Sequence, residues 1–178
     1  MGEITVIAVE RRRPFGAASG GDAALGNKRS EPMADVEIRI QEILSKLREC
    51  KYKVTPQRVA IIKILADSKG HPSVEEIFER LQKDFPGTSM ATVYRTIMLV
   101  KSMGEALELR FADGSNRYDG SKPYPHPHVV CTRCNKIIDL QASNLKAMAR
   151  QVTEETGFRI ETYRLDFFGV CAKCQNNT

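Results

Sequence analysis

The sequence predicts an α+β protein, with an N-terminal winged helix-turn-helix DNA-binding domain followed by a small C-terminal α/β domain. Three observations predict this fold: short amphipathic segments bounded by helix-cap residues up to Gly104, a hairpin pattern between Leu107 and Tyr118, and two Cys-x-x-Cys pairs in the last third of the chain. The chain has 178 residues, 42% of them hydrophobic, which is enough for one ordinary domain or two small ones with a buried core.

The composition restricts the compartment and the class of partner. Lys and Arg number 27 and Asp and Glu number 22, and the resulting charge of +5 permits nucleic acid as a partner without requiring it. The chain has no run of about 18 apolar residues, so we expect no membrane-spanning helix. Its N-terminal apolar run, residues 4–9, is too short for a secretory signal, so we expect a cytoplasmic protein. In that reducing compartment, Cys-x-x-Cys pairs indicate metal ligands or redox dithiols before disulfides.

Residues 1–32 contain a basic triplet and a Gly- and Ala-rich stretch without periodicity. Such a segment has little to bury, which predicts a disordered N-terminal arm. The alternative is an extension upstream of the true start, because Met33 opens the first periodic segment.

Two amphipathic helices are predicted first. The first begins near Asp35, and its apolar face contains Val36, Ile40, Ile43 and Leu47. The second begins at Pro56 after the N-cap Thr55, and its inward stripe contains Val59, Ile62 and Leu65.

Two further helices complete the predicted helical half. Ser73 and Glu76 form a capping box for a third helix that ends at residues 85–87, with an inward face of Val74, Ile77, Phe78 and Leu81. Ser89 caps a fourth helix that stops at Gly104. Its expected core face contains Met90, Val93, Ile97 and Val100.

The hairpin follows the fourth helix. Leu107, Leu109 and Phe111 alternate with polar residues, Asp113 and Gly114 form the predicted turn, and the second strand runs through Tyr118. Residues 33–120 are therefore the predicted winged-helix domain, and residues 121–125, with two prolines, are the predicted hinge.

The predicted C-terminal domain spans residues 126–178. Residues 128–131 and 136–140 indicate a hairpin closed over the first cysteine pair. A helix is expected from about Ser143 to Gly157, and its side chains Leu145, Met148 and Val152 are expected to face the core. Residues 158–170 indicate a long strand whose alternation changes phase, which predicts either a bulge or a strand buried on both faces at a dimer interface, and we favour the interface.

The exposed face of the fourth predicted helix suits the major groove of DNA. With Val93 inward, Ala91, Arg95 and Met98 point away from the core, and Arg can bind guanine through two hydrogen bonds. A solvated surface is the alternative, but the stretch from Lys46 to Lys63 carries six basic residues and one acidic residue, as a phosphate-binding surface requires. The candidate DNA contacts are Lys53, Thr55, Arg58, Ala91, Thr92, Tyr94 and Arg95.

Four of the five cysteines indicate a structural zinc site. They form two pairs with 36 residues between them: Cys131 with Cys134, and Cys171 with Cys174. Four thiolates provide the closed tetrahedral shell of structural Zn²⁺. A redox-switched dithiol and a rubredoxin-like iron centre are the alternatives. The remaining Cys50 is interpreted as a small core or surface residue.

The three histidines indicate a second, harder metal site. His126 and His128 lie at period two, so both imidazoles project from one face of an extended segment. Together with His71, Asp119 and Asp139 they would form a mixed N/O set suited to Fe(II), Mn(II), Ni(II) or Zn(II). Taken singly, a histidine before proline such as His71 is usually a loop residue, and Asp119 is usually a strand-end cap, so only the His-x-His pair is specific by itself.

The chain resembles the ferric uptake regulator (Fur) family of bacterial metal-dependent repressors over about residues 35–175. The resemblance rests on Thr55-Pro-Gln-Arg58, His71-Pro-Ser-Val-Glu-Glu-Ile-Phe78, Ala91-Thr-Val-Tyr-Arg-Thr96, His126-Pro-His128-Val-Val-Cys131-Thr-Arg-Cys134 and Gly169-Val-Cys171-Ala-Lys-Cys174. It implies a homodimer with a C-terminal α/β dimerisation domain that binds a palindromic double-stranded operator. It also implies a regulatory metal held by residues matching His71, Asp119, His126, His128 and Asp139.

Within the family, the residues favour the peroxide-sensing (PerR) branch. The last carboxylate ligand is typically Asp in that branch and Glu in iron sensors, and here it is Asp139. Tyr163 also stands where iron sensors often have a further histidine. The branch implies that Fe(II), rather than Mn(II), reacts with peroxide and that His71 or His126 is oxidised, which releases the operator.

Three other functions remain as alternatives. The first is an iron-responsive, or zinc- or manganese-responsive, uptake regulator of the same family. The second is a small zinc hydrolase with an open site at His126, His128 and Asp139. The third is an electron carrier with an iron tetrathiolate.

Overall fold

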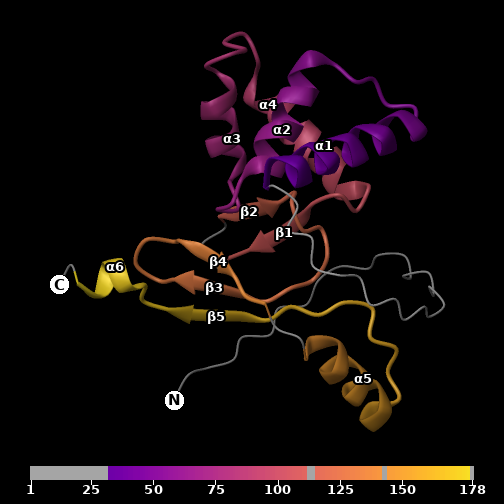
Figure 1. Ribbon diagram of the computed structural model, residues 1–178, viewed down its shortest axis with the longest axis vertical. Coiled ribbons are helices and arrows are strands. Elements are labelled where there is room, and N and C mark those ends of the chain that lie inside the picture. Colours follow the sequence, from indigo (N-terminus) through magenta and orange to yellow (C-terminus); the bar gives the residue numbers. More distant parts are fainter. Residues whose placement is uncertain (1–31, 112–114, 142–143, 177–178) are drawn as a thin grey trace. The chain divides into compact units, whose positions relative to one another are not determined.

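A computed structural model describes residues 32–111, 115–141 and 144–176 (Figure 1). The described residues form two compact units, which divide between Tyr124 and Pro125. Residues 1–31 of the predicted arm, the turn residues Asp113 and Gly114, and the predicted helix start at Ser143 lie outside the described part. Within that part, none of the helices has the length and apolar character needed to cross a bilayer.

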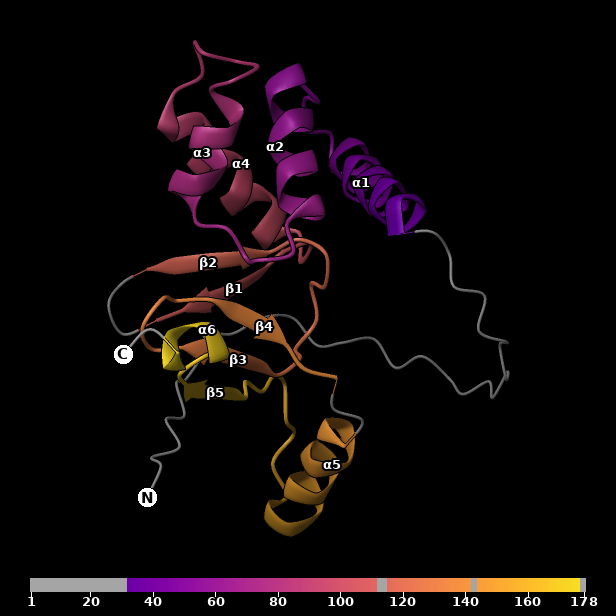
Figure 2. The ribbon, with the colours of Figure 1, turned by 60° about the vertical axis from the view of Figure 1, so that its left-hand side comes forward.

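The N-terminal unit contains four helices and one hairpin, as the winged helix-turn-helix prediction requires (Figures 1 and 2). Its elements are α1 (Pro32–Glu49), α2 (Pro56–Asp67), α3 (Val74–Leu81), α4 (Met90–Ser102), β1 (Leu107–Arg110) and β2 (Asn116–Asp119). The strands pair antiparallel with Leu107 opposite Asp119. The predicted inward residues of α1 and α2 pack into one core with α3 and α4, and Ile43, Leu47, Ile62 and Ile97 are fully buried.

The predicted helix starts are confirmed by their caps. The Thr55 hydroxyl accepts a hydrogen bond from the backbone N–H of Arg58, and Ser89 caps α4 in the same way. Ser73 and Glu76 make both hydrogen bonds of a capping box at α3. These side chains satisfy N–H groups that have no partner within the helix, which fixes where each helix begins.

Three details of the helical half differ from the prediction. Helix α3 ends at Leu81, before the expected residues 85–87, because the chain then enters a turn in which Asp84 N–H donates to the Leu81 carbonyl. Met90 is exposed because it lies in the first turn of α4, beyond the packed face. Met98 is half-buried against the core instead of pointing away, because it flanks the buried Ile97.

The C-terminal unit is built on a three-stranded sheet in the order β4-β3-β5 (Figure 2). Its elements are β3 (His128–Cys131), β4 (Ile137–Asp139), α5 (Leu145–Thr156), β5 (Asp166–Gly169) and α6 (Ala172–Gln175). β3 pairs antiparallel with β4, as predicted for a hairpin over the first cysteine pair, and parallel with β5. As predicted, α5 ends at Gly157, which adopts the left-handed conformation with φ of 71°.

Two predictions for this unit are wrong in the structure of the single chain. The long strand expected over 158–170 is limited to Asp166–Gly169, because the pairing with β3 begins at His128 and the earlier residues have no strand beside them in the described part. No residue of α5 is buried, so the expected inward stripe at Met148 and Val152 faces solvent.

Candidate metal centres and DNA-binding surface

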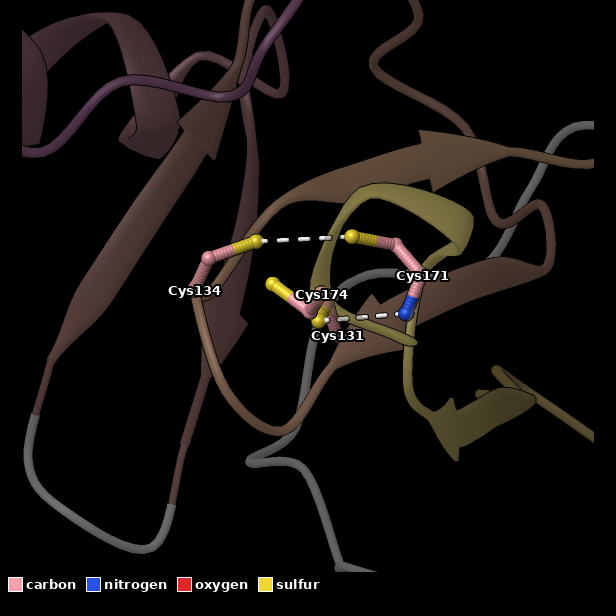
Figure 3. Close-up of side chains that lie close together, drawn as sticks. All are labelled: Cys131, Cys134, Cys171 and Cys174. Atoms are coloured by element: carbon pink, nitrogen blue, oxygen red, sulfur yellow. Dashed lines mark hydrogen bonds between the residues drawn. The ribbon is translucent and has the colours of Figure 1, made fainter. Parts of the chain in front are cut away.

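Both cysteine pairs come together in the C-terminal unit. Cys131 ends β3 and Cys134 lies in the turn before β4, whereas Cys171 precedes α6 and Cys174 lies within it (Figure 3). The four sulfurs lie within 4.8 Å of one another, and the Sγ atoms of Cys134 and Cys171 are 3.8 Å apart. With Zn–S bonds of about 2.3 Å, a tetrahedral site has sulfur–sulfur edges of about 3.8 Å. The arrangement therefore fits a tetrathiolate Zn²⁺ site.

Backbone hydrogen bonds shape this site and favour thiolates. The N–H of Cys171 donates to Cys131 Sγ at 3.3 Å, and backbone donors from Cys171, Cys134 and Arg133 lower the pKa of Cys131 to about 6. Hydrogen bonds with Cys134 and Cys171 favour the protonated thiol and raise the pKa of Cys174 to about 12. A bound dication would displace the thiol protons and allow all four cysteines to bind as thiolates.

His71 and Asp119 form a buried pair in the N-terminal unit. His71 precedes α3, Asp119 ends β2, and His71 Nε2 lies 3.4 Å from Asp119 Oδ2. The backbone of His71 has φ of +53°, an uncommon conformation for a residue other than glycine that concentrates at functional positions.

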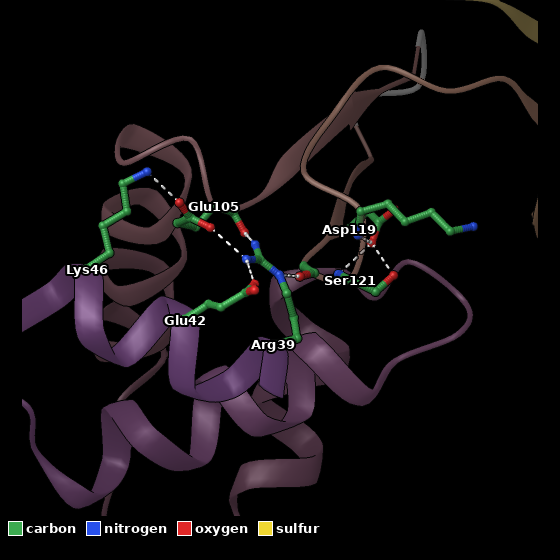
Figure 4. A network of polar contacts seen from close by, with 8 residues as sticks. Arg39, Glu42, Lys46, Glu105, Asp119 and Ser121 are labelled. Atoms are coloured by element: carbon green, nitrogen blue, oxygen red, sulfur yellow. Dashed lines mark hydrogen bonds and ion pairs between the residues drawn. The ribbon is translucent and has the colours of Figure 1, made fainter. Parts of the chain in front are cut away.

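The carboxylate of Asp119 is oriented by the loop that follows it. Its Oδ1 accepts hydrogen bonds from the backbone N–H and hydroxyl of Ser121, each at 2.8 Å, and from the backbone N–H of Lys122 (Figure 4). Burial opposes ionisation, but the interactions with His71, Lys122 and Ser121 outweigh it and lower the pKa of Asp119 to about 2. Oδ2 is thereby held toward the imidazole as a charged oxygen donor.

The peptide after Asp119 is fixed by two helices. Arg39 on α1 donates from Nε to the carbonyl of Gly120 at 2.8 Å and from its terminal nitrogens to Glu105 (Figure 4). Burial opposes ionisation of Glu105, but hydrogen bonds from Lys46 and Arg39 outweigh it and lower its pKa. On the other side, a Cβ at Gly120 would lie 2.5 Å from Leu65 Cγ on α2, so only glycine fits.

His126, His128 and Asp139 form a triplet in the C-terminal unit. The Nε2 atoms of His126 and His128 lie 3.4 Å and 3.9 Å from Asp139 Oδ1, and the two imidazole centroids are 4.3 Å apart. His128 is directly opposite Asp139 in the antiparallel pairing of β3 and β4, which places both side chains on one face of the sheet. The expected common direction of the two histidines is thus observed.

The His71–Asp119 pair and the His126–His128–Asp139 triplet each have donor atoms that suit a first-row divalent cation. Imidazole nitrogen and carboxylate oxygen together suit Fe(II) and Mn(II), whereas the thiolate group suits zinc. Each unit by itself supplies fewer ligands than the four to six that such ions normally take from protein and water. The pair and the triplet are each a partial donor set.

The predicted DNA contacts all belong to the N-terminal unit but differ in availability. Ala91, Tyr94 and Arg95 on α4 are exposed, as is Lys53 before α2. The hydroxyls of Thr55 and Thr92 are engaged at helix starts, and Arg58 donates to the Lys53 carbonyl. Lys46, counted in the basic stretch, pairs with Glu105. Arg95, Tyr94 and Lys53 are therefore the side chains best placed for a ligand.

Sequence reasoning missed the residues that orient Asp119. Ser121 could have been found from the Asp-Gly-Ser order, since Asp side chains commonly accept from backbone two residues on. Arg39 precedes Gly120 by 81 residues, and no local pattern connects them.

Comparisons with known proteins agree with this architecture. The family model for the ferric uptake regulator family matches residues 49–168. The peroxide-responsive repressor PerR of Staphylococcus aureus is 35% identical over 147 residues, covering 83% of this chain and 99% of that protein. A zinc-bound manganese uptake regulator is 32% identical with a TM-score of 0.59 and coverages of 72% and 98%. The ferric uptake regulator from Francisella tularensis with iron is 29% identical with a TM-score of 0.62 and coverages of 70% and 95%.

Proposed function

Because the chain belongs to the ferric uptake regulator family, we propose that it is a metal-dependent DNA-binding repressor that responds to peroxide. The observation that carries the proposal is that each unit holds a buried or nearly buried imidazole 3.4 Å from a carboxylate, His71 with Asp119 and His126 with Asp139. Members of this family are transcriptional repressors, so the chain is a regulator and the hydrolase alternative is set aside.

The pair and the triplet are proposed to share one regulatory cation, Fe(II) or Mn(II). Its ligands are His71, Asp119, His126, His128 and Asp139. A cation with ligands on both units binds best to the arrangement that brings those ligands together, so its occupancy shifts the population toward that arrangement. We infer that this arrangement is the one that fits the operator.

The cysteine cluster has a separate, structural role. Four thiolates complete the coordination shell of Zn²⁺ and leave no open position for a substrate. The ion connects the end of β3 to the segment after β5, because Cys131 and Cys171 belong to these two places. Zinc binding energy is then part of the folding free energy of the C-terminal unit.

Peroxide sensing is assigned to the histidines of the N/O site. Bound Fe(II) would supply the electron that converts hydrogen peroxide to a hydroxyl-like oxidant beside these ligands. His71 or His126 would gain one oxygen on its imidazole ring, and the oxidised ring is a weaker nitrogen donor. The short carboxylate of Asp139 favours this reaction over simple iron sensing, because it leaves room for peroxide.

Repressors of this family bind DNA and act as dimers. For this chain we propose a palindromic operator that mirrors the two-fold axis of a homodimer, with α4 of each protomer in the major groove. We propose that the C-terminal unit contacts the second copy, since several of its large apolar side chains are exposed: Met148, Val152, Phe158, Phe167 and Phe168. Contact with a second copy would remove part of this apolar surface from water.

The second candidate is an iron-responsive regulator of the same fold. The observation in its favour is the donor set itself, because nitrogen and oxygen ligands hold Fe(II) whether or not peroxide reacts there. The two candidates share every structural feature described above and differ in the response to peroxide.

The shared-cation proposal is tested by a double-mutant cycle across the two units. His71→Ala and His126→Ala should each weaken Mn(II) binding by more than about tenfold, and the double variant should be little worse than either, because each single change disables the same site. Asp84→Ala, at an exposed carboxylate in the turn after α3, is the control and should bind Mn(II) normally. Additive losses in the double variant would mean that the two histidines serve separate sites.

A further inference from the structure

A second carboxylate lies on the opposite side of His128 from Asp139. In the sheet order β4-β3-β5, His128 on the central strand is opposite Asp139 on β4 and opposite Asp166 on β5. Residues directly opposite one another in neighbouring strands project from the same face. The three side chains therefore form one row across the sheet, with the imidazole between two carboxylates.

The two carboxylates approach different ring nitrogens. Asp139 lies toward Nε2 at 3.9 Å, whereas Asp166 Oδ1 lies 3.3 Å from Nδ1. The side chain of Asp166 is only 8% exposed, and its other oxygen accepts a hydrogen bond from Arg164 Nε. Arg164 thus fixes the carboxylate, and the carboxylate faces Nδ1.

We propose that Asp166 is a positioning residue for the regulatory cation site: its carboxylate holds His128 in the tautomer whose Nε2 lone pair can bind metal. A carboxylate accepts a hydrogen bond and cannot donate one, so the ring proton is drawn to Nδ1 and the lone pair is left on Nε2. Metal-binding histidines are commonly oriented by such a carboxylate. The inference rests on the proposed role of His128 as a ligand and adds Asp166 and Arg164 to that site.

The placement of Asp166 depends on the same two strands that carry the zinc ligands. β3 runs from His128 to Cys131 and β5 from Asp166 to Gly169, with Cys131 opposite Gly169. The N–H of Thr132 donates to the Gly169 carbonyl at 2.8 Å, and Cys171 follows two residues later. Closure of the thiolate site thereby holds the register that brings Asp166 beside His128.

The test compares Asp166→Asn with Glu161→Gln in the full-length, zinc-containing protein. Glu161 is an exposed carboxylate upstream of β5 that pairs with Arg159, so it controls for the loss of one negative charge nearby. Mn(II) affinity, measured from the EPR signal of the free ion, should fall by about 10- to 100-fold in Asp166→Asn and stay unchanged in Glu161→Gln. Zinc content should be the same in both variants.

The tautomer of His128 is a second readout, and it is measured on the wild-type protein. Long-range ¹H–¹⁵N spectra of wild-type protein holding only zinc, recorded at pH 8 and assigned with single His→Ala variants, should show the His128 proton on Nδ1. A proton on Nε2 would overturn the inference, as would Mn(II) affinity of Asp166→Asn within twofold of wild type. If His128→Ala itself binds Mn(II) normally, the proposed ligand set fails; if His128→Ala loses Mn(II) and Asp166→Asn does not, only the role of Asp166 fails.

Discussion

Arg95 and Lys53 are both exposed cations of the N-terminal unit, but they differ in what they can recognise. Arg95 lies on α4, where its planar guanidinium can form two hydrogen bonds to guanine. Lys53 lies before α2 and offers a point charge suited to phosphate. Arg95 is therefore the candidate for base recognition, and Lys53 is the candidate for contact with a DNA phosphate.

This difference predicts two distinct phenotypes. Arg95→Ala should cost about 1–3 kcal/mol of operator binding and relax base preference at one position, because a bidentate contact is lost. Lys53→Ala should weaken binding to all DNA sequences alike. It should also reduce the slope of the logarithm of the binding constant against the logarithm of salt concentration by about 1, since one phosphate contact disappears. Fluorescence anisotropy with operator and scrambled duplexes at several salt concentrations measures both. Unchanged operator affinity in Arg95→Ala would place base recognition elsewhere.

Asp139 provides the residue-scale test of peroxide sensing. Asp139→Glu should keep Mn(II)-dependent operator binding but slow histidine oxidation, because the longer carboxylate can complete the coordination shell and exclude peroxide. Mass spectrometry of iron-loaded variant and wild type after equal peroxide exposure gives the comparison. Equal oxidation of the two proteins would remove Asp139 as the determinant.

Some of these residues could be identified from sequence and others could not. The Cys-x-x-Cys pairs and the His-x-His pair are recognisable because their spacing alone places the donors together. Arg39 and Asp166 act through contacts 81 and 38 residues away, set by helix packing and by strand register. Such partners become visible only once the tertiary structure is known.

At the scale of helices and strands, Gly120 connects the His71–Asp119 pair to the helical core. It follows Asp119, its carbonyl accepts from Arg39, and its Cα packs against Leu65. The contact with Leu65 is close enough that any side chain at this position must displace α2 or the loop.

Gly120→Ala should therefore lower the unfolding free energy by about 1–3 kcal/mol and weaken Mn(II) binding, because the new methyl group overpacks the core beside Asp119. Gly70→Ala is the matched control: a Cβ there has no atom within 4 Å, so the change should be neutral or slightly stabilising. Urea denaturation and Mn(II) titration measure the two effects. Equal stability of the two variants would contradict the packing described here.

The thiolate site is predicted to hold the C-terminal sheet together. Cys134→Ser should lose about one zinc per chain and lower the melting temperature of the C-terminal unit, because the link between β3 and the segment after β5 is broken. Zinc analysis and calorimetry provide the measurement, with Cys50→Ser, at an exposed cysteine outside the cluster, as the control. A zinc-free variant with wild-type melting would exclude a structural role.

Elements with local start signals could be predicted well, and the C-terminal strand could not. Thr55, Ser73 and Ser89 fix helix starts through hydrogen bonds within four residues. The extent of β5 depends on β3, a partner that lies nearly 40 residues away. Periodicity at residues 158–165 showed an apolar pattern but not the neighbour that a strand requires.

At the scale of the whole molecule, the proposed regulatory ligands are divided between the two units. His71 and Asp119 belong to one, and His126, His128 and Asp139 to the other. In the proposed function, one cation binds ligands on both the DNA-binding unit and the unit assigned to dimerisation. Cation occupancy therefore changes the affinity for DNA. Damage to one ligand then has a consequence for the entire repressor.

The most direct measurement exposes the iron-loaded protein to low peroxide and follows operator affinity and peptide mass together. The account predicts that the peptide carrying His71 or His126 gains one oxygen and that operator binding is lost. Manganese-loaded protein should show neither change, because Mn(II) does not readily reduce peroxide to a hydroxyl-like oxidant. Iron-loaded protein that keeps both its mass and its operator affinity would contradict peroxide sensing and favour the iron-responsive regulator.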